Sequence, residues 1–162
     1  MKTRKLYIFS SRFKGFSLIE LIIVMLLLGI FTAIAMTRTD MGLSTIREQI
    51  AIDQITSDID LARSMAFAKR ESITIVFNIQ DESYTVYEGT TVISDFPNSD
   101  NGTIQLDNSM LKDVDIESVA LSGSGNNELQ FLPLGDVQDG GSIFLNTREI
   151  EIKPITGKWT VK

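Results

Sequence analysis

The sequence predicts an α+β protein in which one long N-terminal helix packs on a C-terminal head of antiparallel strands. The first observation behind this prediction is a stretch without proline from residue 16 to about residue 70, apolar first and amphipathic later. The second is a change to strict alternation after Glu71, which is typical of half-buried strands. The expected organisation is a basic segment at 1–15, a membrane-length helix at 16–36, an amphipathic helix at 37–71 and a β-rich head at 72–162.

The N-terminal segment differs in charge from the rest of the chain. Residues 1–15 contain five basic side chains and no acid, whereas the whole chain of 162 residues has 15 basic and 21 acidic residues and a net charge of −6. The remaining residues therefore carry ten basic and 21 acidic groups, a net charge of −11. Such a balance argues against nucleic acid as a partner. The five basic residues are Lys2, Arg4, Lys5, Arg12 and Lys14.

The apolar stretch from Phe16 to Met36 has the length of a membrane span. As a helix its 21 residues would extend ~32 Å, enough to cross the hydrocarbon core of a bilayer. The basic residues before it predict a cytoplasmic N-terminus. The alternative is a secretory signal peptide cleaved after Ala33-Ile34-Ala35. The length of the apolar run and the acid within it, Glu20, argue against that alternative.

The second half of the predicted helix is amphipathic. Its apolar residues recur at intervals of three and four, which places them on one face of a helix. That face should cover the sheet, and a similar stripe precedes it at Leu43, Ile46 and Ile50. The main stripe is Ile52, Ile55, Ile59, Ala62 and Ala66, and the polar residues expected mostly off the stripes are Arg47, Glu48, Asp53, Asp58, Asp60 and Arg63.

Short strands separated by turns account for the rest of the chain. Clusters rich in Gly, Asn, Asp and Pro punctuate it, which predicts one or two antiparallel sheets. The expected strands are 73–79, 84–88, 90–94, 103–106, 114–121, 128–132, 142–146, 149–153 and 158–161.

The composition leaves few routes to catalysis. The chain has no Cys and no His, which excludes thiol nucleophiles, Cys or His zinc sites and a Ser-His-Asp relay. No carboxylate pair or Ser-Lys pair is placed in an evident pocket, so we expect no enzyme, no catalytic residue and no cofactor.

Two acidic clusters contain the oxygen-bearing side chains that calcium sites use. The loop with Asp95, Asn98, Asp100 and Asn101 fails the EF-hand frame, because Pro97 and Ser99 would occupy ligand positions. Asp113, Asp115 and Glu117 alternate as the exposed face of a strand. We therefore expect no metal site, and we interpret both clusters as solvated surface.

The most specific motif is Gly15-Phe16-Ser17-Leu18-Ile19-Glu20-Leu21, at the junction of the basic segment and the apolar run. It resembles the class III signal of type IV pilins and pseudopilins. The resemblance implies that a prepilin peptidase removes residues 1–15 as a leader by cutting between Gly15 and Phe16. It also implies methylation of the new N-terminus at Phe16. Glu20 would be the acid at the fifth mature position, where it can pair with the Phe16 amine of its own or an adjoining chain.

Less specific sequence similarities to this family are found in the second half of the helix and in the head. The segment from Leu61 to Ala66 with Lys69-Arg70 is similar to the helix-to-sheet junction of GspH/FimT-type minor pseudopilins. The segments 129–135 and 155–161 also resemble that subfamily, with Lys158 where Arg is frequent. A plain β-meander explains the second region too.

The resemblance implies a structural role. The chain would be a minor subunit of a type II secretion pseudopilus or a type IV pilus, located near the filament tip. Its partners would be the prepilin peptidase and methyltransferase, other major and minor pseudopilins or pilins, the inner-membrane assembly platform and the lipid bilayer before assembly. It would cross the bacterial inner membrane once, with the head in the periplasm. The alternatives are a membrane-anchored periplasmic binding module that does not polymerise and a pilin of a DNA-uptake system.

Overall fold

The structure of the chain is a computed structural model that describes residues 15–122 and 125–162, without the side chains of 36–41. The basic residues expected in the leader lie outside the described residues. By its internal contacts the chain divides into two compact units, Met1–Asp40 and Met41–Lys162. Each unit is described by itself below.

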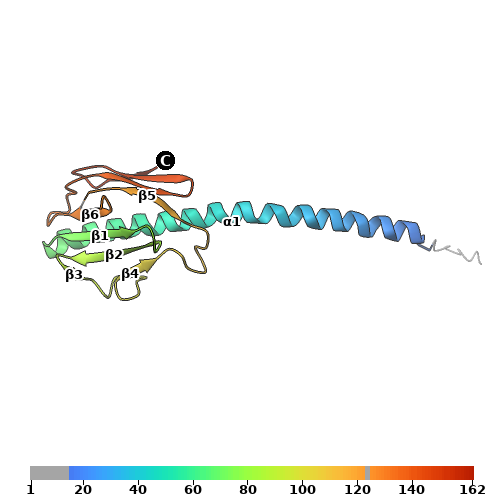
Figure 1. The fold of residues 1–162 in the computed structure, drawn as a ribbon, viewed down its shortest axis with the longest axis horizontal. Coiled ribbons are helices and arrows are strands. Elements are labelled where there is room, and N and C mark those ends of the chain that lie inside the picture. Colours follow the sequence, from blue (N-terminus) through green and yellow to red (C-terminus); the bar gives the residue numbers. More distant parts are fainter. Residues whose placement is uncertain (1–14, 123–124) are drawn as a thin grey trace, which may run out of the picture. The chain divides into compact units, whose positions relative to one another are not determined.

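A single helix, α1 (Leu18–Lys69), occupies the region for which a long helix was predicted (Figure 1). The predicted ends near Phe16 and Arg70 are each within two residues of those observed. The helix ends where Arg70 adopts a left-handed backbone conformation with φ 57°. After Glu71 and Ser72 the chain enters the first strand.

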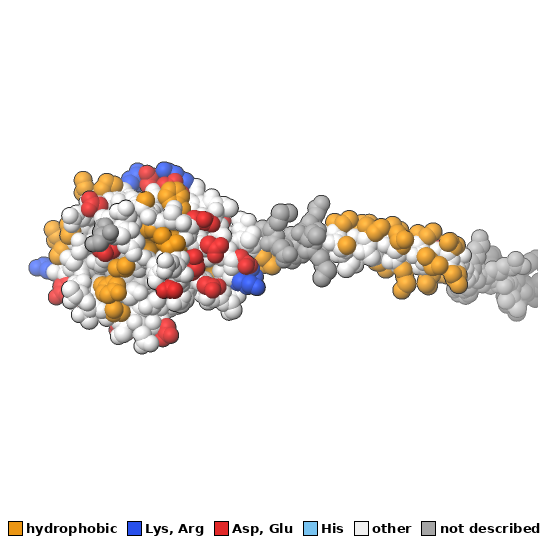
Figure 2. Space-filling model, in the orientation of Figure 1, with side chains coloured by type: hydrophobic (Ala, Val, Ile, Leu, Met, Phe, Trp, Pro, Cys, Tyr) orange, Lys and Arg blue, Asp and Glu red, His pale blue; other side chains and the backbone are white. Residues whose placement is uncertain are grey.

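The first part of α1 is long and apolar enough to cross a membrane. The window Leu18–Ala35 has a mean hydropathy of 2.7, and none of it is buried. Figure 2 shows hydrophobic side chains over this stretch. Leaving so many large apolar side chains in water is costly, at ~25 cal/mol per Å², so this surface requires lipid or other protein.

Two antiparallel sheets form the β-rich part of the unit Met41–Lys162. The first has the order β3-β2-β1-β6, and β4 pairs with β2 beside β3. The second has the order β5-β7-β8-β9. The strands are β1 (Ile73–Asn78), β2 (Ser83–Glu88), β3 (Thr91–Val92), β4 (Thr103–Gln105), β5 (Ile116–Ala120), β6 (Glu128–Phe131), β7 (Gly141–Leu145), β8 (Arg148–Ile152) and β9 (Trp159–Val161).

Each strand lies within or overlaps one of the predicted segments, and the two sheets confirm the predicted antiparallel arrangement. The register of β1 against β2 pairs Phe77 with Tyr84, whose rings pack with centroids 5.4 Å apart. A register shift between Ile116 and Ser118 interrupts the pairing of β5 with β7. Such a bulge bends a strand locally.

The core of this unit forms between α1 and the two sheets. The predicted helix stripe is fully used, because Ile52, Ile55, Ile59, Ala62 and Ala66 are all at most 1% exposed. Buried residues of both sheets complete the core. They include Ile73, Ile75, Phe77, Tyr84, Val86, Leu129 and Phe131 in the first sheet and Ile116, Ile143, Leu145, Ile150 and Ile152 in the second.

Two features of the helix differ from the expectation. The earlier stripe of Leu43, Ile46 and Ile50 is exposed, so it does not extend the face that packs on the sheets. In its place the buried face continues through Ala51 to Glu48, which is only 4% exposed. Asp58, also expected off the stripe, is 5% exposed. Glu48 lies four residues before Ile52, and Asp58 lies three residues after Ile55. Both therefore fall on the buried face of the helix despite their charge.

Candidate functional site

The predicted cleavage site lies immediately before α1. Gly15, Phe16 and Ser17 are outside the helix, and the side chain of Phe16 is 78% exposed. A Cβ atom built on Gly15 would meet no other atom within 4 Å. The described part of the chain therefore places no steric demand on residue 15. A requirement for glycine there would come from a protein that handles this segment.

Glu20 lies in the first turn of α1, where its carboxylate is favourably placed relative to the helix dipole. It is exposed, and it is the acidic residue of the apolar window Leu18–Ala35. Glu20 follows the predicted new N-terminus at Phe16 by four residues, and Phe16 itself lies just before the helix. In a bilayer or in an apolar filament core, a carboxylate at this position is costly unless it reaches the interface or meets a partner of opposite charge.

Within the unit Met41–Lys162, a buried carboxylate joins α1 to the second sheet. Glu48 accepts hydrogen bonds from the backbone N–H of Thr147, at 2.8 Å, and from its hydroxyl group, at 2.7 Å. Thr147 lies in the tight turn between β7 and β8. On the neighbouring position of the helix, Gln49 accepts a hydrogen bond from Arg148. These contacts fix one end of the β7–β8 hairpin to the helix.

A second buried carboxylate joins α1 to the first sheet. The hydroxyl group of Tyr84 on β2 donates a hydrogen bond to Asp58 at 2.5 Å. Burial raises the pKa of Asp58, and the hydrogen bond from Tyr84 opposes that increase. Burial and the nearby Asp58 carboxylate together raise the pKa of Tyr84, so the phenol remains protonated and a donor. Sequence reasoning missed both Glu48 and Asp58, although extending the apolar stripe by its own period would have found them.

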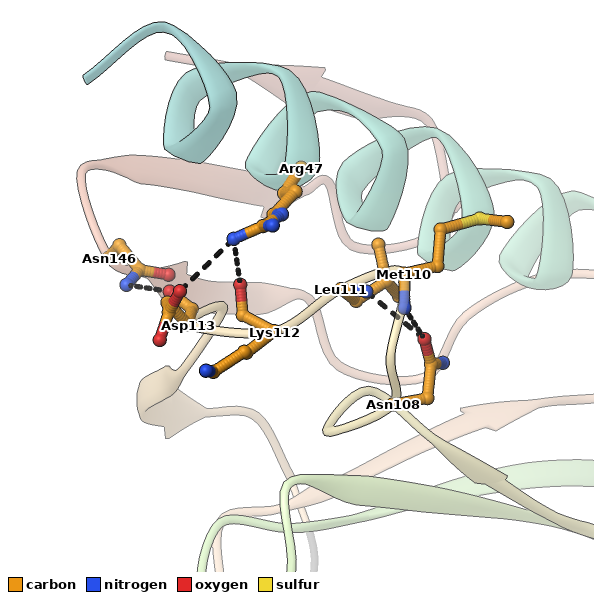
Figure 3. Close-up of polar contacts among 7 residues, drawn as sticks. All are labelled: Arg47, Asn108, Met110, Leu111, Lys112, Asp113 and Asn146. Atoms are coloured by element: carbon orange, nitrogen blue, oxygen red, sulfur yellow. Dashed lines mark hydrogen bonds and ion pairs between the residues drawn. The ribbon is translucent and has the colours of Figure 1, made fainter. Parts of the chain in front are cut away.

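An exposed ion pair lies near the start of the packed part of α1 (Figure 3). Arg47 donates hydrogen bonds to a carboxylate oxygen of Asp113, at 3.1 Å, and to the backbone carbonyl of Lys112, at 3.3 Å. Asn146 donates to the Asp113 carbonyl from the β7–β8 turn. Asp113 therefore belongs to a structural contact between the helix and a loop.

The acidic clusters have no geometry that points to a metal. Among residues 15–122 and 125–162, no three Asp or Glu side chains gather closely enough to hold an ion. Glu82 instead accepts a hydrogen bond at 2.6 Å from the backbone N–H of Ile116, which ties the β1–β2 turn to β5. Its pKa is raised by partial burial and by nearby carboxylates such as Asp115, while the Ile116 bond lowers it.

The hollows on the described surface are open rather than enclosed. One of about 680 Å³ lies over β7 and β8 and mixes Glu117 and Glu149 with Arg148 and Lys162. Glu149 accepts a hydrogen bond from Ser142 at 2.6 Å. This is the arrangement of a solvated sheet surface, and it aligns no nucleophile with a base.

Two protein families match the chain at different positions. Residues 10–36 match the prokaryotic N-terminal methylation motif, which includes Gly15, Phe16 and Glu20. Residues 51–161 match the type II transport protein GspH, over more than half of the chain. The chain belongs to the GspH family. No curated protein and no solved structure gives a significant match.

Together the two matches identify the chain as a pilin-like pseudopilin of the type II secretion or type IV pilus kind, with a prepilin leader. GspH-family proteins are structural subunits, and membership implies processing by a prepilin peptidase and assembly with other pseudopilins or pilins. The one apolar helix described, together with the methylation motif, fits a single-pass protein of the inner membrane. The match to GspH begins at residue 51 and ends at residue 161, so it takes in Asp58, Tyr84 and Thr147.

Proposed function

We propose that this chain is a minor subunit of a type II secretion pseudopilus or a type IV pilus. The observation that carries the proposal is the combination of two matches on one chain, a methylation motif over an apolar helix followed by a GspH-type head. In this proposal residues 1–15 are removed after Gly15, Phe16 is methylated, and 16–36 anchor the subunit. Residues 37–71 carry the helix onto the head, and 72–162 form the head.

The exposed apolar helix supports this assignment. The Leu18–Ala35 surface is long enough for a bilayer, and it suits equally the apolar interior of a helical filament. With the N-terminus in the cytoplasm and the head in the periplasm, extraction from the membrane exchanges lipid contacts for contacts with other subunits. The assembly platform of the inner membrane would perform that extraction, and a minor subunit would act near the filament tip.

In this proposal, a charge pair between neighbouring chains determines how the subunits are positioned in the filament. Cleavage after Gly15 creates an amine at Phe16, four residues before Glu20, which is about one turn once the helix extends to the new N-terminus. Leaving either charge unpaired in an apolar environment costs free energy. A pair between the Phe16 amine of one chain and Glu20 of another would also set the axial stagger between subunits.

The experiment replaces Glu20 by Ala and by Gln in the full chain and measures crosslinking to partner subunits in membranes. Both variants should remain inserted, because the helix becomes more apolar, and both should lose most of the crosslinking. Glu71→Gln is the matched control, since Glu71 is an exposed acid outside the apolar window. Wild-type crosslinking and secretion or piliation by Glu20→Ala would refute the charge-pairing mechanism.

Processing provides an independent test of the family assignment in the same cells. Gly15→Leu should block cleavage, because a bulky side chain prevents the peptidase from approaching the backbone. A side chain at residue 15 meets no atom of the described residues, so this substitution should not disturb the head. A subunit that is cleaved normally but never crosslinks to another would be a membrane-anchored binding module that does not polymerise.

A further inference from the structure

An apolar trough lies where α1 ends, beside the turn that follows β6. Two adjoining hollows of about 500 and 510 Å³ share Phe67 and Leu134 as lining residues. Both side chains are strongly exposed, at 66% for Phe67 and 71% for Leu134. Pro133 and Ala68 extend the apolar lining of the second hollow. We call this surface the Phe67–Leu134 trough.

The turn that presents Leu134 is fixed in position. The N–H of Gly135 donates to the Leu132 carbonyl at 2.7 Å, and the N–H of Leu132 donates to the Asp136 carbonyl at 2.8 Å. Arg63 on α1 donates from Nε to the Gly135 carbonyl at 3.1 Å, which ties the turn to the helix. A side chain held out on a rigid turn loses little conformational freedom when a partner covers it.

One end of the trough carries a positive charge. Arg70 is the one charged residue that lines the second hollow, and within the described part of the chain no carboxylate forms an ion pair with it. The neighbouring Lys69, by contrast, pairs with Glu88 at 2.5 Å. In the first hollow, Asp60 lies with Arg63 and accepts a hydrogen bond from Trp159 at 3.2 Å. The free positive charge therefore lies beside Phe67 and Leu134.

The backbone at Arg70 adds an independent observation. Its φ of 57° lies in the left-handed region, which a residue with a Cβ adopts less readily than the right-handed one. Glycine is the residue most often found at this position after a helix. This turn ends α1 at Lys69, so Arg70 lies at the end of the helix beside the second hollow.

We propose that the Phe67–Leu134 trough binds a segment of another polypeptide chain in which an apolar side chain is followed by a carboxylate. The apolar side chain lies between Phe67 and Leu134, and the carboxylate pairs with Arg70. An open trough of this shape suits an extended chain better than a small molecule, which requires an enclosed pocket. Aromatic and Arg side chains are also the types enriched at the centres of protein interfaces.

The test uses the full chain in lipid nanodiscs and three fluorescein-labelled peptides of Gly-Ser background. One carries Phe followed by Asp, the second Phe followed by Lys, and the third Ala followed by Asp. Fluorescence anisotropy should show the tightest binding for the Phe-Asp peptide. Arg70→Glu should weaken that binding about fivefold and shift the preference to the Phe-Lys peptide. Leu134→Ser should weaken it about tenfold.

The matched controls are Lys112→Glu and Met110→Ser. Lys112 is exposed and undergoes the same charge change as Arg70, and Met110 is 66% exposed, but neither lines the trough. Both control variants should bind the Phe-Asp peptide as the wild type does. The proposal is overturned by equal binding of the three peptides, by equal binding to empty nanodiscs, by no binding, or by controls that behave like Arg70→Glu.

Discussion

Asp58 is the residue at which burial and charge conflict most directly. It is 5% exposed, and its carboxylate is held by the hydroxyl group of Tyr84. Because burial raises the pKa of Asp58 in the folded chain, the folded state binds its proton more tightly than the unfolded state does. The stability contributed in this way is fully present below the unfolded pKa of about 4 and is lost as the pH rises through the folded pKa.

We therefore predict a pH-dependent effect of Asp58→Asn. The amide keeps an oxygen acceptor for Tyr84 and does not titrate. The free energy of unfolding of the variant minus that of wild type should therefore be more positive at pH 7 than at pH 4. Urea unfolding at several pH values measures this difference, with fluorescence of Trp159, the single tryptophan of the chain, as the signal. Asp53→Asn is the control, because Asp53 is exposed on the same helix. Parallel stability curves for wild type and Asp58→Asn would contradict the account.

The sequence indicated the candidate processing residues but not the buried acids. Gly15, Phe16 and Glu20 were identified because their local order and the charge before them form a continuous motif. Glu48 and Asp58 occupy positions of the apolar period, yet each depends on a hydroxyl donor that is distant in the chain. The pairing of Asp58 with Tyr84 and of Glu48 with Thr147 requires knowledge of which strands lie against the helix, and no local pattern contains it.

At the scale of elements, Glu48 determines how the β7–β8 hairpin is attached to α1. Its carboxylate is the acceptor for both the N–H and the hydroxyl group of Thr147. Glu48→Ala should lower the free energy of unfolding by about 1–3 kcal/mol, because two partly buried donors lose their acceptor. Glu48→Gln should cost less, since it retains an oxygen for one of them.

Urea unfolding monitored at Trp159 measures both variants. Asp53→Ala serves as the control, because the Asp53 carboxylate accepts a hydrogen bond from Gln49 on the same helix, a contact worth about 0.2–0.5 kcal/mol. If Glu48→Ala costs no more than Asp53→Ala, the contact with Thr147 does not stabilise the head.

The elements themselves were predictable to different degrees. The helix from Leu18 to Lys69 followed from a stretch without proline that is apolar first and amphipathic later, and the strands followed from alternation between turn residues. The sequence does not determine how the strands divide between two sheets, because antiparallel neighbours in sequence can belong to either sheet. The pairing of β1 with β6 joins residues more than 50 positions apart, from Ile73 to Phe131, and only the three-dimensional structure shows it.

At the scale of the whole molecule, the anchor and the head are expected to separate cleanly. A chain that starts at Thr37 lacks the apolar window Leu18–Ala35 but keeps the buried stripe from Ile52 to Ala66. We predict that this shortened chain is soluble and folded, with a cooperative urea transition at Trp159. Size-exclusion chromatography and circular dichroism measure this outcome. Aggregation under all conditions would mean that the head begins elsewhere than at the proposed boundary.

The central claim, that this chain is a prepilin-type subunit, concerns its mature N-terminus. Mass spectrometry of the N-terminal peptide, on protein purified from the membranes of its own bacterium, tests it most directly. The account predicts a chain that begins at Phe16 and carries one methyl group on the Phe16 amine. An intact chain that still begins at Met1, or a chain that begins at Met36 after removal of a signal peptide, would contradict it.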